Sequence, residues 1–278
     1  MQMKRKEIVG EFDDESSGID EKEDIQFDLE HKRGRAEAVK NDLQRHKTEG
    51  GVFSFTALAA IGKLGSEGWI DRIIGPIATG KEADVFLGER LGHKIVIKIF
   101  RMSSASYFRN PTVLQYILGD ERFRKIKRTP KDLIKSWAMK EFRNLKKADE
   151  IGVNSPKAMA IEKNVIVMQY IGAEQPAQPL LKYDADEGEY KELFEQVIGE
   201  IRKMYRGKLV HADLSEYNIL IRDGQAFVID FGQGVLLSHP KAEEFLERDV
   251  KNLCNFFTKR GVDCDPEEIL TNIKKKNG

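Results

Sequence analysis

The stretch that most constrains the fold is residues 208–234, KLVHADLSEYNILIRDGQAFVIDFGQG, in which two short apolar runs flank an Asp-Gly dipeptide. Asp-Gly between alternating apolar residues is a strong signal for a β-hairpin with a two-residue turn. Such a hairpin returns the chain to its starting end, so we expect Asp230 to lie beside Asp213 and Asn218. The pattern therefore predicts two carboxylates and one amide clustered at one end of a hairpin.

These three side chains suit phosphoryl transfer. Hard oxygen ligands bind Mg²⁺, so Asn218 and Asp230 are the candidate ligands of a metal ion that bridges nucleotide phosphates. Asp213 is the candidate catalytic carboxylate that accepts or orients the proton of the attacking hydroxyl. Any one of these residues alone is more typical of a turn cap, but the combination at this spacing favours catalysis.

The same residues match the protein-kinase signature, in which His-x-Asp-Leu precedes Asn and a later Asp-Phe-Gly binds metal. Here the signature runs from His211 to Asn218 and from Asp230 to Gly232. Among kinase-like proteins, HADLSEYN and VIDFGQG resemble the first subfamily of the RIO family of atypical serine/threonine protein kinases, and the resemblance covers residues 50–278. It implies ATP and Mg²⁺ or Mn²⁺ as cofactors, and Asp230 as a residue that transiently accepts the phosphoryl group.

Lys98 lies near the end of an alternating strand pattern, LGHKIVIKIF, and matches the strand lysine of kinases. An unpaired ammonium is costly to bury, so we expect phosphates and a carboxylate near it; an edge-strand lysine that reaches water is the alternative. Glu141 is the expected carboxylate, because Trp137, Glu141 and Leu145 recur at four-residue steps of a predicted helix. A boundary position with an exposed carboxylate is the alternative for Glu141.

The segment GPIATGKEADVFLG contains Gly75, Gly80 and Lys81 at the spacing of a Walker A loop. Glu82 stands where that loop needs Ser or Thr, and a strand pattern follows instead of a helix, so a P-loop NTPase is disfavoured. The kinase alternative is a loop between antiparallel strands whose backbone donors approach the phosphates, although the usual three glycines are absent. Its candidate nucleotide-binding residues are Ala78, Thr79, Gly80 and Lys81.

The pattern AMAIEKNVIVM predicts a hairpin whose buried second strand ends at Met168. The resemblance implies that Met168 is the gatekeeper and that main-chain groups of Gln169 and Ile171 meet the adenine. Core packing also accounts for Met168, since a gatekeeper is itself a core residue. Gly172 then permits the chain to turn into a second lobe.

Residues 102–129 form an unusually long segment between Lys98 and the helix of Glu141. The segment resembles the flexible loop of the first RIO subfamily, and the resemblance implies autophosphorylation at serines within it, namely Ser103, Ser104 and Ser106. Basic residues within 122–131, with aromatic residues nearby, can bind RNA. A solvated mobile loop explains the same charges equally well.

The predicted fold class is α+β, a two-lobed protein-kinase-like fold with a truncated C-terminal lobe. Residues 50–171 would form the N-lobe, with a short helix, an antiparallel sheet, the insertion and the helix of Glu141. Residues 172–278 would form a reduced helical C-lobe with the catalytic loop and the metal-binding hairpin. The chain lacks an Ala-Pro-Glu motif and has 44 residues after Gly234, so no usual activation segment or peptide-binding helices are expected.

Composition sets further bounds. The first thirty residues contain eleven acidic and four basic side chains, so residues 1–49 are expected to be an acidic segment that is disordered or loosely attached. The whole chain has 46 basic and 46 acidic residues, which excludes an argument from net charge about a polyanionic partner. No signal peptide or long apolar run is present, so we expect a cytoplasmic protein without membrane contact. The two cysteines predict neither a disulfide framework nor a metal site.

The predicted function is that of an ATP-dependent serine/threonine protein kinase and ATPase of the RIO type. The resemblance further implies a role in small-ribosomal-subunit maturation, with the subunit precursor, its rRNA and its proteins, as partner. The lack of long charged tails favours an archaeal member. One alternative is a small-molecule phosphotransferase resembling aminoglycoside and choline kinases, which needs a larger helical lobe than this chain has. Another is a catalytically silent scaffold that binds RNA or protein, which would not need Lys98, Glu141 and Asp213 together.

Overall fold

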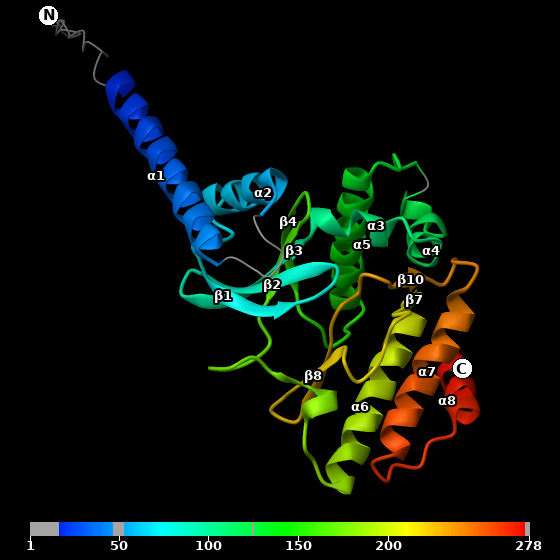
Figure 1. Cartoon of the computed structure of the whole chain (residues 1–278). Coiled ribbons are helices and arrows are strands. Elements are labelled where there is room, and N and C mark those ends of the chain that lie inside the picture. The colour runs from blue at the N-terminus through cyan, green and yellow to red at the C-terminus, as the bar shows by residue number, and fades with distance from the viewer. Residues whose placement is uncertain (1–16, 47–52, 124, 276–278) are drawn as a thin grey trace, which may run out of the picture.

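The computed structural model of the chain describes residues 17–46, 53–123 and 125–275. It shows two lobes, the first built on a five-stranded antiparallel sheet and the second mostly helical (Figure 1). The sheet has the order β1-β2-β3-β5-β4 and comprises β1 (Arg72–Thr79), β2 (Ala83–Arg90), β3 (His93–Phe100), β4 (Ala158–Glu162) and β5 (Val165–Gln169). This arrangement agrees with the two-lobed expectation. Within the described part of the chain, every helix is too short or too polar to cross a bilayer.

Helix α5 (Pro130–Glu150) lies beside the sheet, next to β4 (Figure 1), and carries the predicted glutamate. The side chain of Thr129 caps its first turn by accepting a hydrogen bond from Asp132 N, and Pro130 occupies the first helical position. The expected four-residue stripe is confirmed, because Trp137, Glu141 and Leu145 are all buried. The register of the helix thus points a carboxylate toward the sheet from an otherwise apolar face.

The N-terminal segment differs from the loosely attached segment that its composition predicts. Helix α1 (Ser17–Arg45) packs near its C-terminal end on α2 (Phe55–Ser66), where Val39 and Leu43 are fully buried. The side chain of Asp42 also accepts a hydrogen bond from Ile73 N of β1, at 3.2 Å. An apolar pair at a spacing of four residues is enough to attach one face of a helix, although the average composition of the segment is strongly polar. Residues 1–16 and 47–49 lie outside the described residues.

The insertion is helical, not a flexible loop, over the residues that the structure describes before position 124. Its elements are η1 (Met102–Ser104), α3 (Ala105–Phe108), α4 (Pro111–Leu118) and η2 (Glu121–Phe123). Phe108 and Ile117 are fully buried, and the Phe108 ring lies 5.3 Å from the Trp137 ring of α5. The apolar residues of this segment therefore anchor it on α5, an effect that its Lys and Arg content obscures.

The second lobe places the catalytic stretch between two helices. Its elements are β6 (Gln178–Pro179), η3 (Leu180–Lys182), α6 (Glu187–Arg206), β7 (Leu209–Val210), β8 (Ile219–Arg222), β9 (Gln225–Val228), β10 (Val235–Leu236), α7 (Ala242–Thr258) and α8 (Pro266–Lys274). The hairpin predicted around Asp-Gly is confirmed as the β8–β9 pair, with Arg222 opposite Gln225. Only residues 235–241 separate Gly234 from α7, so the chain passes from the β8–β9 hairpin and the loop after it almost directly into a helix.

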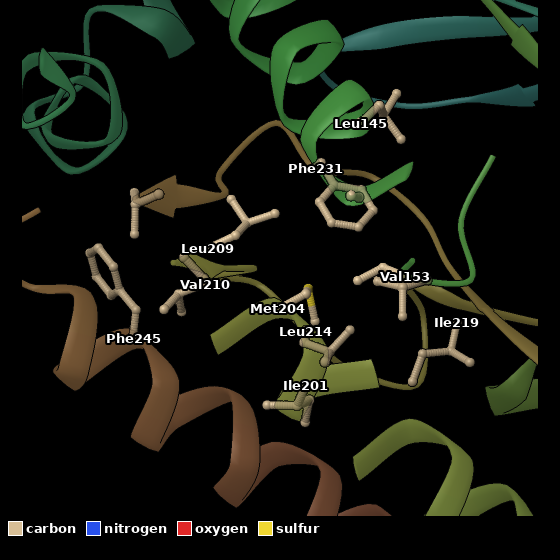
Figure 2. Packing of buried hydrophobic residues seen from close by; sticks show 14 of the residues in the cluster. Leu145, Val153, Ile201, Met204, Leu209, Val210, Leu214, Ile219, Phe231 and Phe245 are labelled. Carbon is tan, nitrogen blue, oxygen red and sulfur yellow. The ribbon is translucent and has the colours of Figure 1, made fainter. Parts of the chain in front are cut away.

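One apolar core joins the two lobes beneath the catalytic stretch. Figure 2 shows Phe231, which directly follows Asp230, packed in the same cluster as Leu145 of α5 and Met204 of α6. Phe231 is fully buried. Because this ring is fixed by packing from both lobes, the position of Asp230 depends on the relative placement of α5 and the C-lobe.

Candidate functional site

The site is a cavity of about 770 Å³ between the sheet of the first lobe and the β8–β9 hairpin of the second. Its volume lies in the range of pockets that bind a cofactor or a small ligand. Most of the sequence-predicted binding residues line it, namely Ala78, Thr79, Gly80, Lys81, Lys98, Glu141, Met168, Gln169, Ile171 and Asp230. The cavity therefore unites residues that are up to 152 positions apart in the chain, from Ala78 to Asp230.

Lys98 is paired with two carboxylates at the base of this cavity. Its Nζ donates to both carboxylate oxygens of Glu141, each at 2.8 Å, and to Asp230 Oδ1 at 3.0 Å. The Lys98 side chain is 11% exposed and that of Glu141 is 2% exposed, whereas that of Asp230 is 46% exposed. Burial would lower the pKa of Lys98, but the charges of Asp230 and Glu141 outweigh it and raise that pKa above its usual value. Lys98 is therefore a cation at neutral pH, facing an aspartate that is open to the cavity.

The two carboxylates differ in their surroundings. Burial raises the pKa of Glu141 to about 7, against the opposing charge of Lys98. Burial would also raise the pKa of Asp230, but the nearby Lys98 ammonium holds it below its ordinary value. Asp230 therefore keeps its negative charge and an accessible oxygen, which is the state that a metal ligand requires.

Asp213 and Asn218 lie at the same end of the hairpin as Asp230, as predicted. Asn218 Nδ2 donates to the main-chain carbonyl of Asp213 at 2.9 Å, and Gln233 Nε2 donates to Asp213 Oδ2 at 2.9 Å. Burial and then the charge of Asp230 raise the pKa of Asp213 to about 6, so Asp213 is still largely ionised at neutral pH. The carboxylate can accept a hydrogen bond or a proton from a hydroxyl that enters the site.

Buried side chains of α7 and of the catalytic loop itself fix the backbone around Asp213. Asp249 of α7 accepts hydrogen bonds from Ala212 N at 2.7 Å and from Leu214 N at 3.0 Å. This matters because Ala212 has a φ of 64°, a conformation that residues other than glycine rarely adopt. His211 Nε2 lies 3.0 Å from the carbonyl oxygen of Ile229, which joins the catalytic loop to the strand that leads into Asp230. Burial lowers the pKa of His211 to about 4, so its ring is neutral at neutral pH.

The candidate nucleotide loop is a turn between the antiparallel strands β1 and β2, which is the geometry of the kinase alternative and not of a Walker A loop. Gly80 N donates to Ala83 O at 2.9 Å and closes the turn. Glu82 lies within this turn, and its carboxylate accepts a hydrogen bond from the hydroxyl of Tyr107 in α3. The insertion thus reaches the edge of the cavity that the phosphates of a nucleotide would occupy.

Two main-chain groups at the junction of the lobes already form hydrogen bonds within the protein. Gln169 N donates to Lys157 O at 2.9 Å, and Ile171 O accepts from Ala177 N at 3.0 Å. Neither of these bonds uses the carbonyl of Gln169 or the N–H of Ile171, which are therefore the candidate main-chain groups for adenine. Met168, the expected gatekeeper, is buried but still lines the cavity.

The basic residues and serines of the insertion differ in whether they are exposed and so able to contact a partner. Arg122 donates to Asp120 Oδ2 at 2.6 Å and to Asn144 Oδ1 at 2.7 Å, so its charge is used inside the protein. Ser104 is buried and donates to Lys81 O at 2.6 Å, while Ser103 and Ser106 are exposed. The exposed basic side chains that follow are Lys125, Lys127, Arg128 and Lys131. Position 124 lies outside the described residues.

Sequence reasoning missed four residues that support the site: Lys140, Asn144, Gln233 and Asp249. Lys140, Asn144 and Asp249 are polar residues at helix positions that an apolar pattern would reserve for the core, and all three are almost fully buried. The signal was visible for Asp249, which interrupts the apolar face of the helix that contains Phe245 and Leu253. For Gln233 the signal was its position directly after the Asp-Phe-Gly motif.

Comparison with known proteins gives three consistent results. A model of the RIO domain matches residues 84–269. The RIO-type serine/threonine-protein kinase Rio1 of Haloferax volcanii is 40% identical over 276 residues, covering 98% of this chain and 91% of that protein. Rio1 of Methanocaldococcus jannaschii is 36% identical over 259 residues, covering 93% of this chain and 88% of that protein.

A solved structure of Rio2 kinase from Chaetomium thermophilum, described as an ADP/Mg²⁺-phosphoaspartate complex, shares the fold. Its TM-score is 0.62 and its sequence identity 24%, with 81% of this chain and 67% of that chain covered. The two-lobed architecture is therefore that of a protein kinase.

Proposed function

The chain belongs to the RIO family of serine/threonine-protein kinases, and from that premise we propose how its residues bind ATP with Mg²⁺ and transfer the γ-phosphoryl group. The observation that carries the proposal is the ion-pair network in which Lys98 joins Glu141 and Asp230 at the base of the cavity. A binding scaffold needs no such network, whereas phosphoryl transfer needs a cation beside the phosphates and an anion that orients it.

Lys98 binds the nucleotide phosphates, and Glu141 orients its ammonium. Adenine lies against Met168 and meets the carbonyl of Gln169 and the N–H of Ile171. The N–H groups and small side chains of residues 78–81 approach the phosphates. Gly172, with a φ of 156°, is the point at which the chain leaves the first lobe. We place the lobe boundary there, between residues 50–171 and 172–278.

Asp230 and Asn218 fit Mg²⁺. The amide nitrogen of Asn218 donates to Asp213 O, so its amide oxygen is left to act as a ligand, and Asp230 supplies a partly exposed carboxylate. Two protein oxygens are what Mg²⁺ commonly takes when phosphates and waters complete its octahedron. When bound, the ion would neutralise charge that develops on the transferred phosphoryl group.

Asp213 orients the acceptor hydroxyl and accepts its proton. Its carboxylate is not part of the Lys98 network and is ionised at neutral pH, since its pKa is about 6. The presence of only residues 235–241 between Gly234 and α7 leaves little chain to hold a peptide beside Asp213. Positioning is most of what accelerates phosphoryl transfer, so a free peptide should be a poor acceptor and water should compete with it.

We therefore propose slow ATP hydrolysis in the cytoplasm, stimulated by a precursor of the small ribosomal subunit. The family resemblance supports this partner, and the exposed side chains of Lys125, Lys127, Arg128 and Lys131 supply charge for RNA phosphates. Hydrolysis would pass through Asp230. Its carboxylate oxygen bonds to the γ-phosphorus as the bond from that phosphorus to ADP breaks, and water then cleaves the acyl phosphate to release phosphate. The phosphoaspartate named for the Rio2 complex supports this step.

The test incubates the full chain with γ-labelled ATP and Mg²⁺, with and without small-subunit precursors. We expect hydroxylamine-labile label that disappears in Asp230→Asn, and phosphate release that the precursor increases. Acid-stable label on serine or threonine in the chain would report kinase activity separately. Efficient phosphorylation of a generic peptide, with no hydrolysis and no effect of the precursor, would overturn the proposed ATPase role and leave the kinase assignment intact.

A further inference from the structure

The FGQG loop, residues 231–234, is held by two buried polar side chains of α5. Asn144 Nδ2 donates to Phe231 O at 2.9 Å and to Gly234 O at 2.7 Å. Lys140 Nζ donates to both glycine carbonyls of the loop, at 3.0 Å from the first. Both α5 side chains are fully buried. A single helix face therefore donates hydrogen bonds to the carbonyl groups of three of the four loop residues.

This anchoring fixes one conformation of the loop. The loop carbonyls are buried with residues 231, 232 and 234, where an acceptor without a donor is costly. The ammonium of Lys140 is equally costly to bury without acceptors. A loop path that withdrew these carbonyls from α5 would leave both sets of groups unpaired, so the loop and α5 hold each other in place.

The insertion orients the amide of Asn144. Arg122 Nη2 donates to Asn144 Oδ1 at 2.7 Å, and Arg122 is itself held by Asp120 at 2.6 Å. With its oxygen turned to a guanidinium, Asn144 must present its NH₂ group to the loop. The chain of contacts therefore runs from the insertion through α5 to the carbonyls of the FGQG loop.

Gln233 is the side chain that this anchored loop presents to the site. Its Nε2 donates to Asp213 Oδ2 at 2.9 Å, whereas Asn218 Nδ2 approaches the same oxygen only at 3.5 Å. Asn218 binds the main-chain carbonyl of Asp213 instead, at 2.9 Å. The direction of the Asp213 carboxylate is thus set by Gln233 more than by Asn218.

We propose that Gln233 is a positioning residue for Asp213, and that Lys140 and Asn144 keep it in place through the FGQG loop. The inference rests on the proposed function, because it assumes that Asp213 meets the acceptor. Gln233 is not among the residues that line the cavity in which we place the nucleotide. Its loss should therefore lower turnover and leave nucleotide binding unchanged.

The test compares Gln233→Leu and Gln233→Glu with the wild type in Mg²⁺-dependent ATP turnover. Leu removes the amide at similar volume, and Glu keeps the shape but presents a second anion to Asp213. Misplacement of a reacting group by about 1 Å costs about 100-fold, so we expect kcat to fall about 10- to 100-fold in both variants. The Kd for Mg-ATP, measured by calorimetry, should stay within about twofold of the wild type, since neither variant removes a phosphate or metal contact.

Gln196→Leu is the matched control. Gln196 is also half-buried, and its amide donates to Gly224 O and accepts from Ala226 N, each at 3.0 Å, at the far end of the β8–β9 hairpin. Its loss should lower the melting temperature and leave kcat unchanged. A role for Gln233 in packing alone predicts that Gln233→Glu behaves like the wild type, because the two side chains have the same size.

The Asp213→Ala background separates this inference from the proposed function. Gln233→Leu should have no further effect on turnover there, because a positioning residue acts only through the group that it positions. Asn144→Leu should lower kcat in the wild-type chain and add little to Gln233→Leu. Loss of turnover in Asp213→Ala with wild-type turnover in both Gln233 variants would overturn the positioning role alone. Full turnover in Asp213→Ala would overturn the proposed function of Asp213, and with it the inference.

Discussion

Replacing Lys98 with Met tests the ion-pair network directly. Met has a similar shape, so the change removes a charge more than a volume. Glu141, with a side chain that is 2% exposed, would lose the cation that faces it and remain beside the acidic side chains of Asp230 and Glu82. Asp230 is 46% exposed, so water can solvate it. The loss of folding stability should therefore come mainly from the unpaired, buried carboxylate of Glu141.

The magnitude depends on pH. Breaking a buried ion pair by removing one partner costs about 3–5 kcal/mol when the remaining charge persists. The pKa of Glu141 is raised to about 7 even with Lys98 present, so without Lys98 the carboxylate should take up a proton more readily. A folded-state pKa above the unfolded value means that the protonated group stabilises the fold at low pH and that this stabilisation is lost as pH rises through the folded pKa. We expect the free energy of unfolding of Lys98→Met to be about 3 kcal/mol or more below that of the wild type at pH 8. At pH 5.5 the difference should be about 1 kcal/mol, because mainly a hydrogen bond is lost there.

The assay is urea unfolding followed by circular dichroism at both pH values, for the wild type, Lys98→Met and Lys98→Met/Glu141→Leu. The double variant should regain most of the stability but not the ATP affinity, which a lost phosphate contact weakens by about 10- to 100-fold. Lys63→Met is the control, because Lys63 pairs with Glu162 at 2.7 Å but is 54% exposed. That variant should lose at most about 1 kcal/mol at either pH. An equal, pH-independent loss in Lys63→Met and Lys98→Met would refute this account of Glu141.

Three further outcomes are expected. Asp213→Ala should bind Mg-ATP normally and lose turnover, whereas Asp230→Ala should lose the Mg²⁺-dependent part of ATP binding; calorimetry with and without the ion separates them. Leu43→Ala should lower the free energy of unfolding by about 2–5 kcal/mol, because Leu43 is fully buried, and leave the ATP Kd unchanged. The pKa of His211 in the folded chain is lowered to about 4, so the unfolded chain binds the proton more tightly. The free energy of unfolding should therefore fall by about 3 kcal/mol as pH drops from 6.5 to 4. His211→Gln should flatten that dependence in melting curves, and an unchanged slope would contradict a neutral buried His211.

Most of the site could be predicted because local sequence sets the local geometry. The Asp-Gly turn determines how far the chain travels before it returns, and this places Asp230 beside Asp213 and Asn218. The pairing of Lys98 with Glu141 followed from two periodicities, one of a strand and one of a helix, each of which puts a charged side chain on an apolar face. The RIO resemblance drawn from these motifs is confirmed by the family match and by the archaeal relatives.

The remaining features depend on contacts between distant segments. The burial of Leu43 requires the matching face of α2, and nothing in the composition of residues 1–49 indicates that this face exists. The helices of the insertion are anchored by the ring of Trp137 from α5, which begins after the insertion ends. From the sequence alone, Lys140 is expected to be a solvated helix residue. Its acceptors are carbonyls of the FGQG loop, and the first of them lies 92 positions further along the chain.

Two consecutive residues of α5 connect that helix to the candidate nucleotide cavity and to the loop that carries Gln233. Glu141 points into the cavity and pairs with Lys98, whereas Lys140 points to the FGQG loop and so toward Gln233. A rotation or retreat of α5 would break both sets of contacts at once, because neighbouring residues on a helix cannot move independently. The insertion packs on the same helix through Phe108 and Trp137, so a partner that moves α5 through the insertion should affect nucleotide binding and turnover together.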